Sequence, residues 1–76
     1  MRKEICGIIY DTALSTRDKK FTFGAPGDDY GYEETLYITA DGNYFIYTNG
    51  GCKSKYPQED IQPIEHSKVR DWMLSH

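Results

Sequence analysis

The sequence predicts a small α+β domain: an antiparallel sheet of three or four strands, with a central hairpin over residues 35–48 and a C-terminal helix packed on one face. Two β-rich runs flank Asp41-Gly42, and this pattern is typical of a tight hairpin turn. Apolar residues recur at helical spacing over residues 66–75. At 76 residues, the chain is expected to form a single compact domain, residues 1–76.

The N-terminal third predicts one strand, one short turn and one loop. Residues 3–10 are rich in β-formers and predict a first strand. Asp11 or Thr12 is a suitable cap for a helical turn over residues 13–15, and this turn is short because a basic segment follows it. Glycine and proline in residues 24–29 predict a turn-rich loop.

The central hairpin has two possible registers. A two-residue Asp-Gly turn pairs Ile38 with Phe45, whereas a three-residue loop with a glycine bulge pairs Ile38 with Tyr44. In both registers Leu36 and Ile38 lie on the same face, because side chains alternate along a strand. That face is the better candidate for the core.

The C-terminal segment predicts an edge strand followed by a helix. Residues 61–64 alternate between apolar and polar side chains, and Pro63 lacks the N–H that a central strand needs, so this strand belongs at an edge. Val69, Trp72 and Met73 form one apolar stripe on the helix. We expect Trp72 to be the largest single contribution to the core.

The centre of the chain carries charge of one sign. Residues 21–52 contain five acidic residues and no Lys or Arg, although the net charge of the whole chain is only −3. Five of the seven tyrosines lie in the same segment. An exposed surface of this kind favours binding to a basic partner and repels nucleic acid. The alternative is that these acids form a solvated face that binds no partner. We expect the acidic residues of this surface to be exposed. The expected partner-binding residues are Asp28, Asp29, Tyr30, Tyr32, Glu33, Glu34, Tyr37 and Asp41.

No pattern in the sequence predicts a metal site or a catalytic site. Cys6 and Cys52 lack the partners of a zinc site, and we expect free thiols with Cys6 partly buried in the first strand, although a disulfide between the two remains open. The acidic residues lack the spacing of a calcium loop. Cys52 and His66 have no third group to orient them as a nucleophile and base, so we expect a non-enzymatic protein without cofactors.

Several short stretches, in chain order, resemble a family of small proteins common in bacteriophages and mobile elements. These stretches are Tyr10-Asp11-Thr12, Glu33-Glu34-Thr35-Leu36-Tyr37, Gly42-Asn43-Tyr44-Phe45-Ile46-Tyr47, Gly50-Gly51, Ser54-Lys55-Tyr56, and Pro63-Ile64 before a helix with Trp72. The family includes anti-CRISPR proteins that block type I effector complexes, so the resemblance implies such an inhibitor. The chain departs from the family at Cys52, where relatives tend to have proline, and in residues 16–20, where they have a fuller helix. The shared motifs are structural, and no contact residue carries over from them.

The charge pattern and the resemblance lead to one expected function. It is inhibition of a CRISPR-Cas effector by an acidic surface that mimics nucleic acid and occupies a basic surface of a Cas subunit. The alternative is a phage accessory domain that binds another host protein. No apolar run approaches the ~20 residues of a membrane span, and the start of the chain lacks the pattern of a signal peptide. We therefore expect a cytoplasmic monomer that binds neither membranes nor nucleic acid.

Overall fold

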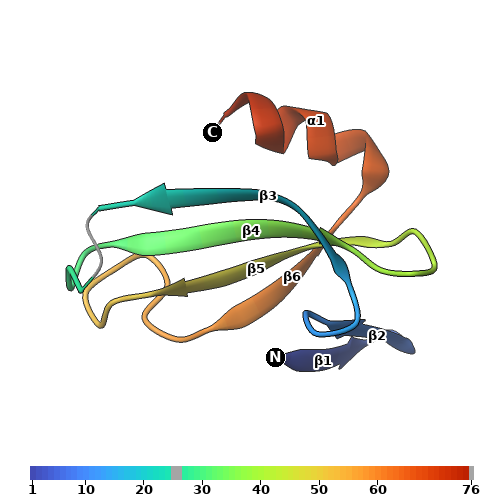
Figure 1. Cartoon of the computed structure of the whole chain (residues 1–76), viewed down its shortest axis with the longest axis horizontal. Helices are drawn as coiled ribbons and strands as arrows, with labels where there is room; N and C mark the ends of the chain where they lie inside the picture. Colours follow the sequence, from blue (N-terminus) through green and yellow to red (C-terminus); the bar gives the residue numbers. More distant parts are fainter. Residues whose placement is uncertain (25–26, 76) are drawn as a thin grey trace.

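The computed structural model of this chain describes residues 1–24 and 27–75, and it confirms the predicted α+β class. Within these residues, four strands form an antiparallel sheet in the order β3-β4-β5-β6, and two more form a separate hairpin (Figure 1). The elements are β1 (Arg2–Ile5), β2 (Ile8–Asp11), β3 (Thr16–Phe23), β4 (Tyr32–Ile38), β5 (Tyr44–Gly50), β6 (Asp60–Ile64) and α1 (His66–Leu74).

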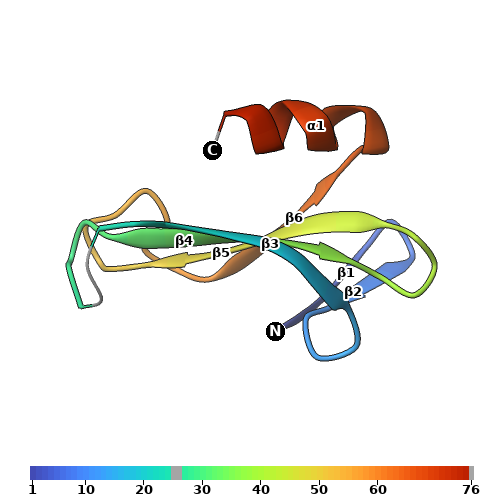
Figure 2. The ribbon, with the colours of Figure 1, turned by 45° about the horizontal axis from the view of Figure 1, so that its top comes forward.

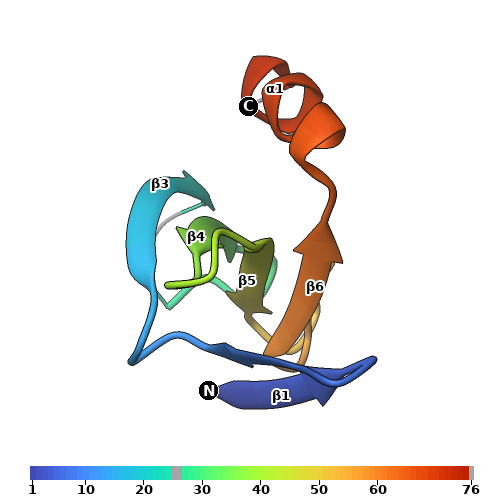
Figure 3. The same ribbon diagram turned by 90° about the vertical axis from the view of Figure 1, so that its right-hand side faces the viewer.

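The four-stranded sheet is covered on both faces. Figures 2 and 3 show α1 on one side of the sheet and the β1-β2 hairpin on the other. Because side chains alternate along β4 and β5, Leu36 and Ile46 face α1, whereas Tyr37 and Phe45 face the β1-β2 hairpin. Both faces of the sheet therefore contribute to the core.

An aromatic cluster forms the core beneath the β1-β2 hairpin. Tyr10, Phe45 and Ile61 are buried, and the Tyr10 ring meets the edge of Phe45 with centroids 5.4 Å apart. Tyr37 stacks on Phe45 at 5.2 Å. The face of Leu36 and Ile38 was the better candidate for the core, and Leu36 is fully buried, but the aromatic cluster lies on the opposite face because the N-terminal hairpin shields that face.

The central hairpin adopts the second of its two possible registers. Ile38 pairs with Tyr44, and the Thr39 amide donates to the Asn43 carbonyl at 2.9 Å. The loop therefore contains three residues, and Gly42 closes it at a φ of +85°. Glycine adopts this left-handed conformation without the steric cost that a Cβ would bring.

The first predicted strand is two strands. Cys6 and Gly7 have φ values of 52° and 78°, and two successive left-handed residues are typical of a tight hairpin turn. Residues 2–11 therefore fold back on themselves as β1 and β2. Cys6 is exposed at this turn, so the expectation of a partly buried Cys6 is wrong.

The segment after β2 also differs from the prediction. Asp11 does cap a turn there, because its Oδ1 accepts the Ala13 amide at 2.9 Å and its carbonyl accepts the Leu14 amide at 3.2 Å, but the turn does not extend into a helix. Residues 16–23 instead pair with β4 as the edge strand β3. Basic side chains are tolerated there because most positions of an outer strand are solvent-exposed.

The predicted C-terminal edge strand and helix are confirmed, whereas the prediction that Trp72 makes the largest contribution to the core is wrong. The proline-containing strand β6 lies at the edge of the sheet, and a helix follows it. No described residue of α1 is fully buried, and Trp72 is only partly covered. The ring lies at the boundary of the core because its Nε1 donates to a carboxylate of the sheet, Glu34, at 3.2 Å.

Candidate functional site

Two loops meet at the end of the sheet where β4 begins and β5 ends (Figure 1). The Gly51 amide donates to the Gly31 carbonyl, and the Lys53 amide donates to the Asp29 carbonyl, each at 2.9 Å. A Cβ on Gly51 would lie 2.5 Å from the Asp29 carbonyl oxygen, so only glycine allows this close backbone contact. The packing of these two loops fixes the backbone around Asp28 and Asp29.

The first predicted acids lie exposed on a tight turn in this region. Asp28 accepts the Tyr30 amide at Oδ1 (2.9 Å), and its own carbonyl accepts the Gly31 amide (3.0 Å). Asp29 is exposed, and Tyr30 is 62% exposed. We call this part of the molecule the loop end and define it by Phe23, Asp28, Asp29, Tyr30 and Tyr32.

A groove of about 480 Å³ opens beside the turn. Asp28, Asp29 and Glu33 all line it, so the structure brings three predicted acids together. Lys20 of β3 lines it too, and its Nζ lies 3.1 Å from Oε2 of Glu33. Glu33 is therefore compensated locally, and the two aspartates carry most of the negative charge of the loop end.

Glu34 was expected to be exposed, and this prediction is wrong. The residue is only 4% exposed. Its side chain points to the helix face, where it accepts the Tyr56 hydroxyl at 2.5 Å and the Trp72 indole N–H at 3.2 Å. A buried carboxylate needs such donors, and these bonds connect the sheet to α1 and to the segment after β5.

Two further predicted residues lie away from the loop end. Tyr37 is partly buried in the stack with Phe45, so little of its ring is available to a partner. Asp41 is exposed, but it lies in the hairpin between β4 and β5, at the opposite end of the sheet (Figure 1). The eight predicted residues therefore do not form one continuous surface.

The one-signed charge of the central segment is partly neutralised in three dimensions. Lys20 reaches Glu33 because β3 pairs alongside β4. Lys53 places its Nζ 5.9 Å from the centre of the Tyr30 ring, and its amide donates to the carbonyl of the preceding Asp29. Both lysines lie just outside residues 21–52 in the sequence, so a count of charges along the chain could not show that they lie close to this segment in space.

Sequence reasoning missed two aromatic residues at this end of the molecule. Phe23 is 55% exposed and stacks on Tyr32 with ring centroids 5.2 Å apart. Tyr56 meets the Tyr32 ring edge-on at 5.4 Å. The alternation of Phe21, Thr22 and Phe23 was an available signal for an edge strand with one aromatic face.

Two tyrosine hydroxyls stay protonated because of their surroundings. Burial, the hydrogen bond to Glu34 and the charge of that carboxylate raise the pKa of Tyr56 well above its ordinary value. Burial and the 2.8 Å hydrogen bond to Glu59 raise the pKa of Tyr47 to about 12. Tyr56 therefore remains a donor to Glu34 at every physiological pH.

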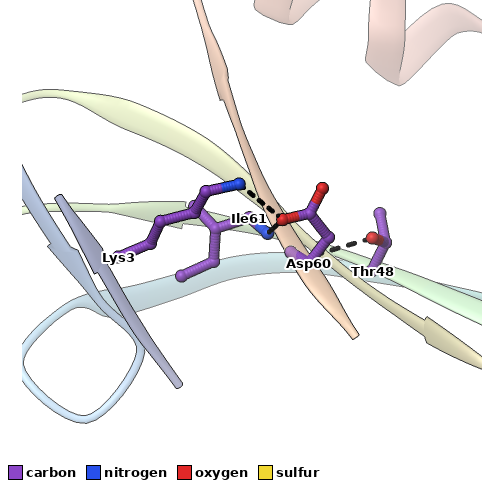
Figure 4. A network of polar contacts seen from close by, with 4 residues as sticks. All are labelled: Lys3, Thr48, Asp60 and Ile61. Carbon is purple, nitrogen blue, oxygen red and sulfur yellow. Dashed lines mark hydrogen bonds and ion pairs between the residues drawn. The ribbon is translucent and has the colours of Figure 1, made fainter. Parts of the chain in front are cut away.

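An ion pair outside the loop end attaches the N-terminal hairpin to the sheet (Figure 4). Lys3 Nζ lies 2.7 Å from Oδ1 of Asp60, which also accepts the Ile61 amide at 2.8 Å. The hydrogen bond from Lys3 is the main reason that the pKa of Asp60 is lowered from its ordinary value. Thr48 donates to the Asp60 carbonyl at 3.4 Å, so this network joins β1, β5 and β6.

The described residues bring together neither a cluster of metal ligands nor the pair Cys52 and His66. No group of three or more His, Cys, Asp or Glu side chains among them is placed to hold a metal ion. Cys52 lies in the loop after β5, whereas the His66 ring contacts Tyr44 and the Gly42 carbonyl at the opposite end of the sheet. These two residues are therefore not brought together, and both cysteines are free thiols.

Comparison of the chain with protein-family models, curated proteins and solved structures gives no match. Across residues 1–24 and 27–75, no helix has the length and apolarity to cross a membrane.

Proposed function

We propose that this protein is a non-enzymatic inhibitor of a bacterial defence complex, a type I CRISPR effector, and that its loop end contacts a basic nucleic-acid-binding surface of the complex. The observation that carries the proposal is the exposure of Asp28, Asp29 and Tyr30 on one backbone-bonded turn. The choice of a type I CRISPR effector as the target follows from the resemblance of the short sequence motifs to a phage family that includes anti-CRISPR proteins.

The loop end combines charge with a fixed backbone. Asp28 and Asp29 present two carboxylates to solvent, which favours fast association with a basic surface. Tyr30 and Phe23 add large exposed rings, and aromatic residues are frequent anchors of interfaces. Because hydrogen bonds already hold the turn, binding costs less conformational entropy than it would for a disordered loop.

A second candidate function is binding to a host protein that does not handle nucleic acid. The partial neutralisation of Glu33 by Lys20 favours it, because it reduces the one-signed charge that mimicry needs. The exposed rings of Phe23 and Tyr30 would then provide most of the contact. Salt dependence separates the two functions, since charge-driven association is screened over about 8–10 Å at physiological ionic strength.

The direct experiment measures binding of the purified protein to a purified type I effector complex and competition with its target DNA. We expect competition that weakens as salt rises. The double variant Asp28→Lys, Asp29→Lys should slow association by about tenfold or more at low salt, because steering is reversed. Both positions are exposed, but Asp28→Lys loses the hydrogen bond that its Oδ1 accepts from the Tyr30 amide, so the melting temperature should fall by about 2–12 °C while the protein stays folded at 25 °C.

The matched control reverses two acids outside the loop end, Asp18→Lys with Asp41→Lys. Both are exposed, and the change in net charge is identical. If the control loses competition as strongly as the loop-end variant, net charge rather than this surface drives binding. If the wild type does not bind the effector, the proposed target is wrong.

A further inference from the structure

We infer that the outer edge of β3 is an interface at which two copies of this chain pair antiparallel, so that their two four-stranded sheets join into one continuous sheet. The inference does not depend on the proposed function, because it concerns the edge of the sheet and needs no defence complex. It replaces the monomer that the sequence led us to expect.

Hydrogen bonds at both ends of the β4-β5 pair show which way the backbone of β4 points. The Thr39 amide donates to the Asn43 carbonyl, and the Gly51 amide donates to the Gly31 carbonyl. Bonded and non-bonded pairs alternate along two antiparallel strands. The odd-numbered residues of β4 therefore bond to β5, and the even-numbered residues of β4 bond to β3.

The same alternation identifies the backbone groups at the outer edge of β3. Lys19, Phe21 and Phe23 pair with the even-numbered residues of β4, so their N–H and C=O groups point into the sheet. The N–H and C=O groups of Lys20 and Thr22 point away from it. Among residues 1–24 and 27–75, no backbone group from outside the sheet bonds to these two residues, and Figure 3 shows β3 at the outer edge. Two donors and two acceptors are therefore open to a further strand.

The opposite edge of the sheet is closed to such pairing. By the same alternation, Ile61 and Pro63 are the residues of β6 whose backbone points outward. The Ile61 amide already donates to Oδ1 of Asp60 at 2.8 Å, and proline has no N–H. Because only the β3 edge offers open donors, two copies that join there form a closed pair rather than a growing fibre.

One symmetric register uses both open positions of β3. It places Phe21 on the two-fold axis, so that Lys20 of each copy exchanges two hydrogen bonds with Thr22 of the other. An axis at Lys20 would bring two like charges opposite each other. An axis at Thr22 would pair Lys20 with Gly24, which lies beyond the end of β3 and has a φ of +81°. The register centred on Phe21 is therefore the one that we propose.

The charges of the edge are compatible with this register, although lysine on an edge strand commonly opposes pairing. Lys20 Nζ lies 3.1 Å from Oε2 of Glu33 in its own sheet, so its charge is already compensated. Lys19 would lie opposite Phe23 of the second copy. That residue is 55% exposed, and an ammonium is attracted to the face of an aromatic ring. Over residues 19–23, the register opposes no two like charges.

The first test measures self-association of the wild-type protein by sedimentation equilibrium. A single pair of edge strands is a small interface, so we expect a reversible dimer with a dissociation constant of about 1 mM or less. Hydrogen exchange of the Lys20 and Thr22 amides should slow as the protein concentration rises, because these amides become bonded in the dimer. In a mixture of isotope-labelled and unlabelled protein, NMR contacts should appear between Lys19 of one copy and the Phe23 ring of the other.

A pair of variants at one position tests the hydrogen bonds. Thr22→Pro removes an outward N–H and hence half of the bonds between the two copies, so it should weaken the dimer by about tenfold or more. The bonds between β3 and β4 do not use this N–H, and circular dichroism at low concentration checks that the variant is folded. Thr22→Val keeps the N–H and the shape of the side chain, so it should dimerise like the wild type.

A wild-type protein that stays monomeric at about 1 mM would overturn the inference. So would a dimer that Thr22→Pro does not weaken, or, if that variant does not fold, a dimer without the contacts between Lys19 and Phe23. A monomer whose Lys20 and Thr22 amide signals shift when an extended acidic peptide is added would also overturn it, because the edge would then fit a different chain.

These outcomes are distinct from failure of the proposed function. A dimer that does not bind the effector supports the β3 interface and rejects the proposed target. Effector binding by a protein that stays monomeric at about 1 mM rejects the β3 interface alone.

Discussion

Replacement of Glu34 by leucine removes the buried acceptor that connects the sheet to α1 and to Tyr56. The Tyr56 hydroxyl and the Trp72 indole N–H both lose this partner. Hydrogen bonds to a charged group contribute about 1.5–3 kcal/mol each, so two of them amount to about 3–6 kcal/mol. Leucine recovers part of this loss, because a buried leucine contributes about 1.5–3 kcal/mol and no charge remains to be desolvated. We expect a net destabilisation of about 2–4 kcal/mol.

That loss is large for a domain of this size. At about 0.05–0.15 kcal/mol per residue, the whole chain has a free energy of unfolding of about 4–11 kcal/mol. The melting temperature of a small domain falls by about 4–8 °C per kcal/mol. Glu34→Leu should therefore melt about 10–30 °C below the wild type in far-UV circular dichroism. Fluorescence of Trp72, the only tryptophan, should report a more polar environment for its ring below the melting transition.

Glu34→Gln is the matched control, because glutamine keeps the shape and one acceptor oxygen but removes the charge. We expect a loss of about 1–2 kcal/mol, because Tyr56 and Trp72 bond to different oxygens of Glu34 and only one of them keeps an acceptor, now a neutral one. If Glu34→Leu melts within about 3 °C of the wild type, the carboxylate does not connect the elements as we infer. If the glutamine variant is as unstable as the leucine variant, the charge matters rather than the acceptor geometry.

Three further changes test other contacts. The pKa of Tyr47 is about 12 in the folded protein, against an ordinary value of 10.0. The protonated Tyr47 hydroxyl therefore stabilises the fold fully below pH 10, and this stabilisation is lost between about pH 10 and 12. The melting temperature of Tyr47→Phe should depend less on pH in that window than the melting temperature of the wild type does. Gly51→Ala should cost about 1–3 kcal/mol and shift the amide NMR signals of residues 27–31, because its Cβ meets backbone atoms that cannot move aside; unchanged signals would contradict the loop packing. Lys3→Met should lower the free energy of unfolding by less than about 1 kcal/mol, because the side chains of Lys3 and Asp60 are both more than 40% exposed. An NMR titration of this variant should show that the pKa of Asp60, which is lowered in the wild type, has risen. The contribution of the ion pair to stability is present at neutral pH and is lost as the pH falls through the pKa of Asp60 in the folded protein.

The loop end was only partly predictable from the sequence. Asp28, Asp29 and Tyr30 were identified because turn residues and consecutive charges are exposed in most folds. Phe23 was missed because β3 was not recognised, and Glu34 was misplaced because strand alternation shows which residues share a face but not what covers that face.

The sequence by itself determined the elements that depend on local conformation. The Asp-Gly loop, the edge strand with Pro63 and the helix with a stripe through Trp72 all follow from the φ preferences of glycine and proline and from apolar periodicity. These properties act within a few residues, and the structure agrees with the sequence at each of these elements.

Only the tertiary structure decided the distribution of charge and the burial of Glu34. Strand pairing brings Lys20 to Glu33, and the return of the chain after β6 brings Trp72 to Glu34 across 38 positions. A segment that is acidic along the chain is therefore not an equally acidic surface. The electrostatic potential at a surface depends on distances in space, and the sheet places together residues that are far apart in the sequence.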